Sequence, residues 1–156
     1  MSLQSFIAGL PKAELHVHHV GSASPRIVSE LAARHPAAGV PSDLEALREF
    51  FTFRDFAHFI EVYLAVVDLV RTPEDVRLLT YEVAREMAEG QNLRYAELTC
   101  TPYTSVVRGI PIQAYTEAIE DARVAAERDF GLVLRCSSAY ASVASAAGIP
   151  DSPGMS

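Results

Sequence analysis

Hydrophobic positions along the chain fall into short runs that alternate with longer stretches of helical spacing. The short runs, at residues 13–18, 92–100 and 132–136, are bounded by breaker residues and predict three β-strands. Segments with helical spacing lie between them. This alternation is typical of right-handed crossovers and a parallel sheet, so the pattern predicts an α/β fold.

Capping residues mark where several helices begin and end. Ser24 and Pro25 predict a helix start and Pro36 its stop, while Thr72 begins a helix that we expect to end near Gly90. Further helices are expected at residues 42–50, capped by Ser42, at 53–70, and at 111–129. In the helix at 53–70, one apolar face is expected to consist of Phe56, Phe59, Ile60, Tyr63, Val67 and Val70.

Bulk composition narrows the class of protein. A chain of 156 residues, 49% of them hydrophobic, is long enough for one soluble domain. A net charge of -7 supplies no basic surface for nucleic acid or an anionic membrane, and no apolar run reaches the roughly 18 residues of a membrane span. The N-terminus lacks a secretory signal pattern, and two cysteines make no disulfide framework. We therefore expect a cytoplasmic protein with no nucleic-acid or membrane partner.

Three histidines stand within four positions near the N-terminus, in the stretch PKAELHVHHVGSASP. Strand positions two apart share a face, so Glu14, His16 and His18 are expected on one face and the buried Leu15 and Val17 on the other. The two imidazoles can then reach one metal ion from the C-terminal end of the strand. The neighbouring His19 points the other way and is a poorer candidate. Taken alone, His-x-His is more often a surface or hydrogen-bonded pattern than a metal site.

The residues that flank the two histidines favour the metal site over the surface or hydrogen-bonded pattern. The stretch LPKAELHVHHVGS closely resembles the first strand of the adenosine deaminase family, within the amidohydrolase superfamily. Residues 53–88 resemble the helical excursion after that strand, and residues 92–102 resemble the second barrel strand. The resemblance runs from about residue 10 to residue 135 and is nearest to the bacterial branch, which includes deaminases of adenine and of 6-aminodeoxyfutalosine.

The resemblance implies a fold, a cofactor and a reaction. The fold would be the N-terminal part, about three βα units, of a TIM (β/α)8 barrel with helical insertions after the first strand. One zinc ion per active site would be held in part by His16 and His18. By this resemblance, zinc would lower the pKa of a bound water molecule, and the resulting hydroxide would attack C6 of a 6-aminopurine nucleoside or base, with ammonia as the leaving group. The implied partner is a small purine, and the implied setting is purine and nucleotide metabolism.

Two departures from the family pattern refine this hypothesis. His18 and Val20 are expected to border the substrate, but the family usually has an acidic residue where Val20 stands. Valine cannot accept a hydrogen bond from a sugar hydroxyl, which favours a purine with a different substituent over adenosine. The family's third histidine ligand and its acid and base residues have no counterpart, so we predict no catalytic residue in this chain.

Length predicts an incomplete domain. A TIM barrel needs about 250 residues, so three strands cannot close and leave an edge that invites self-association. We expect residues 1–136 to form an incomplete barrel domain and residues 137–156, rich in Ser and Ala, to be a disordered tail from a truncated or frame-shifted gene. The alternative to a deaminase is a catalytically inactive fragment that acts as a binding or assembly segment.

Other chemically capable side chains favour structural interpretations. Glu97 is expected to be a buried strand residue with a partner rather than a catalytic acid. His58 is expected at the surface or hydrogen-bonded, and Cys100 is expected to be a small buried hydrophobe. The phenylalanines between residues 50 and 59 are expected to pack helices, with a substrate lid as the alternative.

Overall fold

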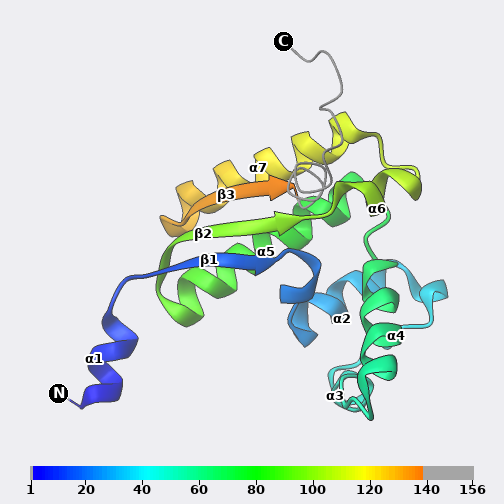
Figure 1. The fold of residues 1–156 in the computed structure, drawn as a ribbon, viewed down its shortest axis with the longest axis horizontal. Coiled ribbons are helices and arrows are strands. Elements are labelled where there is room, and N and C mark those ends of the chain that lie inside the picture. The colour runs from blue at the N-terminus through cyan, green and yellow to red at the C-terminus, as the bar shows by residue number, and fades with distance from the viewer. Residues whose placement is uncertain (1, 139–156) are drawn as a thin grey trace, which may run out of the picture.

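The computed structural model describes residues 2–138 and shows a three-stranded parallel sheet with helices along it (Figure 1). The strands β1 (Lys12–His18), β2 (Leu93–Cys100) and β3 (Val133–Ser138) lie in the order β1–β2–β3. The helices are α1 (Leu3–Gly9), α2 (Pro25–Arg34), α3 (Leu44–Phe50), α4 (Phe56–Val67), α5 (Pro73–Gln91), α6 (Pro102–Val107) and α7 (Ile112–Phe130), with 3-10 turns η1 (Val20–Ser22) and η2 (Pro36–Ala38).

The predicted α/β class, the three strands and their parallel direction are confirmed. The third strand runs two residues further than expected, to Ser138, and the remainder of the expected tail lies outside the described residues. Helices α1 and α6 were not predicted from the sequence. Within residues 2–138, no helix is both long and apolar enough to cross a membrane.

The core lies between the sheet and the two long helices α5 and α7, which run along one face of it (Figure 1). Alternate residues of β2 point into this core, because successive strand side chains face opposite sides. The buried set on the sheet includes Val17, Ala96, Leu98, Cys100 and Leu134, and the helices contribute Leu79, Val83, Ala122 and Ala126. The opposite sheet face carries the polar side chains of β2, such as Glu97 and Thr99.

The pairing of β1 with β2 is irregular in two places, between Lys12 and Ala13 and between Glu14 and Val17, and the second irregularity places an extra residue on β1. Glu14 is in register with Ala96 and Val17 with Leu98, so three steps along β1 match two along β2. This β-bulge corrects the expectation of simple alternation. Glu14 pairs with a residue of the helix-covered face, and Leu15, expected to be buried, is 63% exposed. His16 and His18, either side of the buried Val17, keep a common face.

Two helix boundaries differ from the capping pattern for local reasons. Helix α3 is capped by Asp43 rather than Ser42, because the Asp43 carboxylate accepts hydrogen bonds from the amides of Glu45 and Ala46, both at 3.0 Å. Helix α5 continues past Gly90, and the chain leaves it at Asn92, which adopts the left-handed conformation with φ of 56°.

The expected apolar face of α4 is only partly buried. Val62, Val66 and Val67 face the core, whereas Phe56 is 76% exposed and Phe59 38% exposed. The helix prediction is therefore confirmed, but the aromatic part of its face was wrongly assigned to the core. Periodicity finds an apolar stripe and does not tell which part of the stripe meets other elements.

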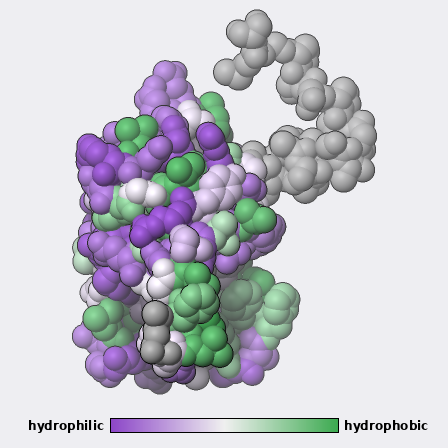
Figure 2. Space-filling view, turned by 90° about the vertical axis from the view of Figure 1, so that its left-hand side faces the viewer, coloured by the Kyte–Doolittle hydropathy of each residue, from purple (hydrophilic) through white to green (hydrophobic). Residues whose placement is uncertain are grey.

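Helix α1 stands at the end of the sheet where the strands begin, and the apolar side chains of the helix and of its C-cap Leu10 are exposed. Leu3, Phe6, Ile7 and Leu10 are between 40% and 73% exposed, on the end of the molecule that Figure 2 turns toward the viewer. The end of the helix is tied to the sheet by the Lys12 ammonium, which donates to the carbonyls of Ala8 and Leu10.

A fully buried carboxylate, Asp75, joins α2 to the start of α5. Its oxygens accept hydrogen bonds from Arg34 and His35, both at 2.7 Å, and from the backbone amides of Arg71 and Thr72. Burial alone would raise the pKa of Asp75, but the bonds from His35, the Arg71 amide and Arg34 outweigh it, so the pKa lies below its ordinary value of 3.8.

We expect Asp75→Asn to lower the free energy of unfolding by about 2–4 kcal/mol, because it removes a buried charge that four donors share. The contribution of Asp75 is complete above its unfolded pKa and is lost as the pH falls through the lower folded value. The gap between parent and variant should therefore shrink in acid. Urea unfolding at pH 7 and pH 3 measures it.

The matched control is Asp121→Asn, which breaks an exposed ion pair with Arg77. That pair is expected to contribute about 1 kcal/mol or less. Equal stability losses in the two variants would contradict the role assigned to Asp75.

Candidate metal centre

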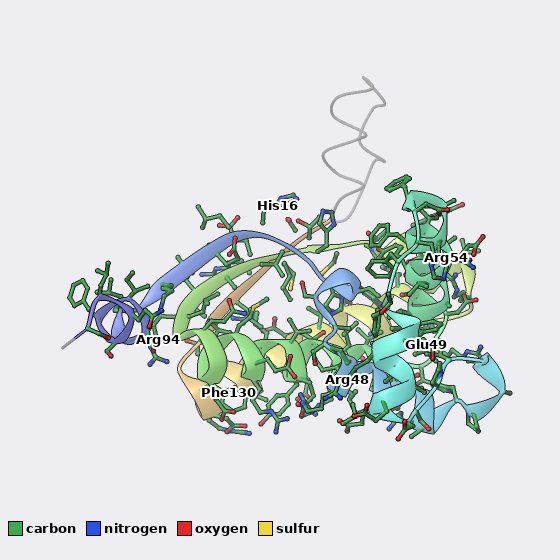
Figure 3. All side chains as sticks on the ribbon, turned by 90° about the horizontal axis from the view of Figure 1, so that it is seen from below. His16, Arg48, Glu49, Arg54, Arg94 and Phe130 are labelled. Atoms are coloured by element: carbon green, nitrogen blue, oxygen red, sulfur yellow. The ribbon has the colours of Figure 1, made fainter. Side chains whose placement is uncertain are left out.

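The imidazole side chains of His16 and His18 project from β1 on the sheet face turned away from α5 and α7. Figure 3 shows His16 on that side of the sheet. His18 follows two residues later, at the end of the strand and in register with Thr99. The Nε2 atoms of His16 and His18 are 3.3 Å apart, and the rings meet edge to face with centroids separated by 5.0 Å. The structure thus brings together the two residues that the sequence proposed as a pair.

The separation of the two nitrogens is what a shared zinc ion requires. Imidazole nitrogens lie about 2.0–2.1 Å from zinc, so two of them at a tetrahedral angle are about 3.3–3.4 Å apart. A hydrogen bond between neutral rings would give a similar distance, with one ring donating. Since both side chains are exposed, an ion and additional ligands have access to the pair. The residues present therefore fit a tetrahedral divalent metal.

No third protein ligand accompanies the pair within the described chain. Among residues 2–138, no cluster of three or more histidine, cysteine, aspartate or glutamate side chains is placed to hold an ion. Catalytic zinc sites have three protein ligands in typical cases. His16 and His18 would thus provide part of a coordination sphere.

His19 lies on the other side of the strand, as expected. It is 3% exposed, and its Nε2 atom is 2.8 Å from the hydroxyl of Thr80, which is itself fully buried. Burial lowers the pKa of His19 to about 4, so the ring is neutral at pH 7. Its interactions are with helix α5 rather than with His16 and His18.

A cleft of about 1120 Å³ runs along the free side of β1 and includes both imidazoles. Val20 and Gly21 line it beside His18, and side chains of α5 such as Val83 and Met87 are also among its lining residues. Three phenylalanines and a tyrosine line one end, with rings in mutual contact: Phe51, Phe53, Phe59 and Tyr63. The phenylalanine stripe therefore borders the cleft as well as packing against helices.

The remaining candidates have structural partners. Glu97 accepts a hydrogen bond from the Tyr95 hydroxyl at 2.7 Å and lies in register with Arg135, so the expected partner is present. His58 accepts a bond from the Arg54 amide through Nδ1. Cys100 is 4% exposed, and its interaction with the Cys136 thiol together with burial raises its pKa well above the ordinary value. The expectations for His58 and Cys100 are confirmed, whereas Glu97 has its partner but is half-buried rather than buried.

Comparison with known proteins places these features in a family. The family model described as adenosine deaminase matches residues 11–149, which extends past the limit of residue 135 inferred from the sequence. The aminodeoxyfutalosine deaminase of Streptomyces avermitilis is 74% identical over 133 residues, covering 85% of this chain and 37% of that protein.

Solved structures similar to this chain support the same family. An adenine deaminase from Arthrobacter aurescens superposes with a TM-score of 0.69 at 29% identity, covering 82% of this chain and 39% of the other. An amidohydrolase from Burkholderia ambifaria, with bound Zn, gives 0.72 at 29% identity, covering 87% and 38%. The chain thus spans well under half the length of the proteins it matches, and the expected fold class, part of a (β/α)8 barrel, is confirmed.

We expect the chain to bind one Zn²⁺ through the histidine pair. His16→Ala and His18→Ala should each raise the dissociation constant at least about tenfold, because a single imidazole holds zinc weakly. Competition with a chromophoric chelator measures the affinity. His58→Ala, which removes a histidine outside the pair, should leave it unchanged; equal effects of all three substitutions would refute the site.

Proposed function

Because the chain belongs to the adenosine deaminase family, we propose that it forms the zinc-binding N-terminal part of a hydrolase that removes the 6-amino group of a purine. The observation that carries this proposal is the 3.3 Å separation of the His16 and His18 nitrogens at the C-terminal end of a parallel strand. Active sites of (β/α)8 barrels lie at that end of the strands.

In this proposal, the residues of this chain contribute two metal ligands and an apolar wall of the cleft to the reaction. His16 and His18 would hold the ion in a fixed direction from the sheet, and a bound zinc ion supplies a Lewis acid that lowers the pKa of water toward neutrality. The aromatic end of the cleft supplies an apolar wall near His18. Such a wall excludes bulk water and offers ring faces on which a planar purine can stack.

Among aminopurines, we propose aminodeoxyfutalosine as the substrate rather than adenosine or adenine. Support comes from the 74% identity to a relative named aminodeoxyfutalosine deaminase, against 34% to the adenine deaminase of Cupriavidus necator. Val20 adds a physical reason against adenosine, though not against adenine, which has no ribose. It lines the cleft beside His18 and cannot hydrogen-bond a ribose hydroxyl. We place this reaction in the cytoplasm, within purine metabolism.

A second candidate function rests on the sheet edges. Within the described residues, β1 and β3 each pair with β2 alone, so each has one side without a strand neighbour. Unpaired strand edges are templates for pairing with another chain. A binding or assembly role without catalysis, including self-association, is therefore the alternative proposal.

A chimaera separates the two functions. Residues 11–138 of this chain would replace the matching segment of the Streptomyces avermitilis relative, and deamination of aminodeoxyfutalosine, adenosine and adenine would be followed by ultraviolet absorbance. We expect the chimaera to prefer aminodeoxyfutalosine. His16→Ala or His18→Ala in the chimaera should reduce turnover by about 100-fold or more, because each removes a direct metal ligand.

The 156-residue chain, assayed alone with zinc, is expected to show no turnover, because its described residues supply only two metal ligands. A folded chimaera that binds zinc but deaminates none of the three purines would contradict the proposed activity. It would leave the assembly role as the better account.

A further inference from the structure

We infer that His19 is a positioning residue for the metal pair: its buried hydrogen bond to Thr80 fixes the backbone from which His18 reaches the ion. The inference rests on the proposed zinc site. In that proposal His19 touches neither the ion nor the substrate. It acts through its contact with Thr80, which joins the loop after β1 to the middle of helix α5.

The backbone around His19 is held from two directions. Its amide donates to the carbonyl of Thr99 on β2 at 3.1 Å, which extends the strand pairing one residue beyond β1. On the other side, the Ser22 hydroxyl donates to the carbonyl of His18 at 2.7 Å. The turn η1 lies next to the ligand, since a Cβ added at Gly21 would be in van der Waals contact with the His18 Cβ, at 3.4 Å. A shift at His19 is therefore passed directly to His18.

The side-chain bond has a defined direction. The Thr80 hydroxyl lies 2.7 Å from the carbonyl of Val76, one turn earlier in α5, and donates its single proton there. Its oxygen must then accept from His19, so the imidazole carries its proton on Nε2. This chain of two bonds ties the loop after β1 to the backbone of α5 in one geometry.

An apolar residue would fill the same space without this constraint. Burying an imidazole costs free energy unless it is hydrogen-bonded, and its bond to Thr80 offsets that cost while setting a distance and an angle. Dispersion contacts alone are non-directional. A metal site tolerates ligand displacements of only about 0.5 Å. We therefore expect loss of a directional bond one residue from a ligand to change zinc affinity more than it changes the stability of the fold.

The test measures zinc affinity and stability separately in the 156-residue chain. His19→Leu keeps the volume buried and removes the bond, whereas His19→Gln retains a donor that can reach Thr80. Thr80→Val removes the acceptor and Thr80→Ser keeps it. The matched control is Thr116→Val on α7, whose hydroxyl makes the same kind of bond to a carbonyl one turn earlier but lies on another helix.

We expect His19→Leu and Thr80→Val each to raise the Zn²⁺ dissociation constant about tenfold, the lower end of effects from residues that orient ligands. His19→Gln, Thr80→Ser and Thr116→Val should stay within about threefold of the parent. The double variant His19→Leu/Thr80→Val should be no weaker than His19→Leu, because both remove the same bond. Circular dichroism at the same temperature confirms that each variant is folded.

Folded His19→Leu with parental zinc affinity would overturn the inference and leave the metal pair intact. So would additive effects in the double variant, which mean that the two side chains act independently. If His19→Leu fails to fold, the comparison of Thr80→Val with Thr80→Ser decides in the same way. A parent that binds zinc no better than His16→Ala would instead refute the metal pair, and the positioning role with it.

Discussion

The register between β1 and β2 is the constraint on which the candidate site depends. An extra residue on β1 between Glu14 and Val17 restores Val17 to the buried face opposite Leu98. His16 and His18 then flank Val17 on the open face, with nitrogens 3.3 Å apart. Bulges re-aim side chains and are frequent beside active sites. Without this one, regular pairing from Glu14 onward would put His16 on the helix-covered side.

Two buried polar connections keep the surrounding helices in place. Asp75 joins α2 to the start of α5, and the His19–Thr80 bond joins the end of β1 to the middle of α5. Helix α5 therefore serves as the frame against which the strand end is set. Apolar packing in the core is non-directional, whereas these bonds set distances and angles: those of Asp75 between α2 and α5, and that of His19 between the end of β1 and α5.

Much of this arrangement follows from the sequence, and the exceptions have physical causes. Helix- and strand-breaking residues at their ends predicted where the strands lie, and Ser24 and Thr72 predicted where α2 and α5 begin. These predictions succeeded because such signals act within a few residues. The His-x-His pair was predicted correctly because His16 and His18, two residues apart, keep a common face despite the bulge. The bulge itself, and hence the exposure of Leu15, was not predictable, since the pairing register depends on β2, which lies far from β1 in the sequence. Similarly, nothing local to His19 indicates Thr80, 61 positions later.

X-ray absorption spectroscopy of the zinc-loaded chain tests the central claim most directly. If His16 and His18 share one ion, the extended fine structure above the zinc edge will show two imidazole nitrogens at about 2.0–2.1 Å, with the outer-shell scattering of two rings. A His16→Ala sample will lose one of the two imidazoles. A spectrum with one imidazole or none in the unsubstituted chain, or one unchanged by the substitution, would contradict the account.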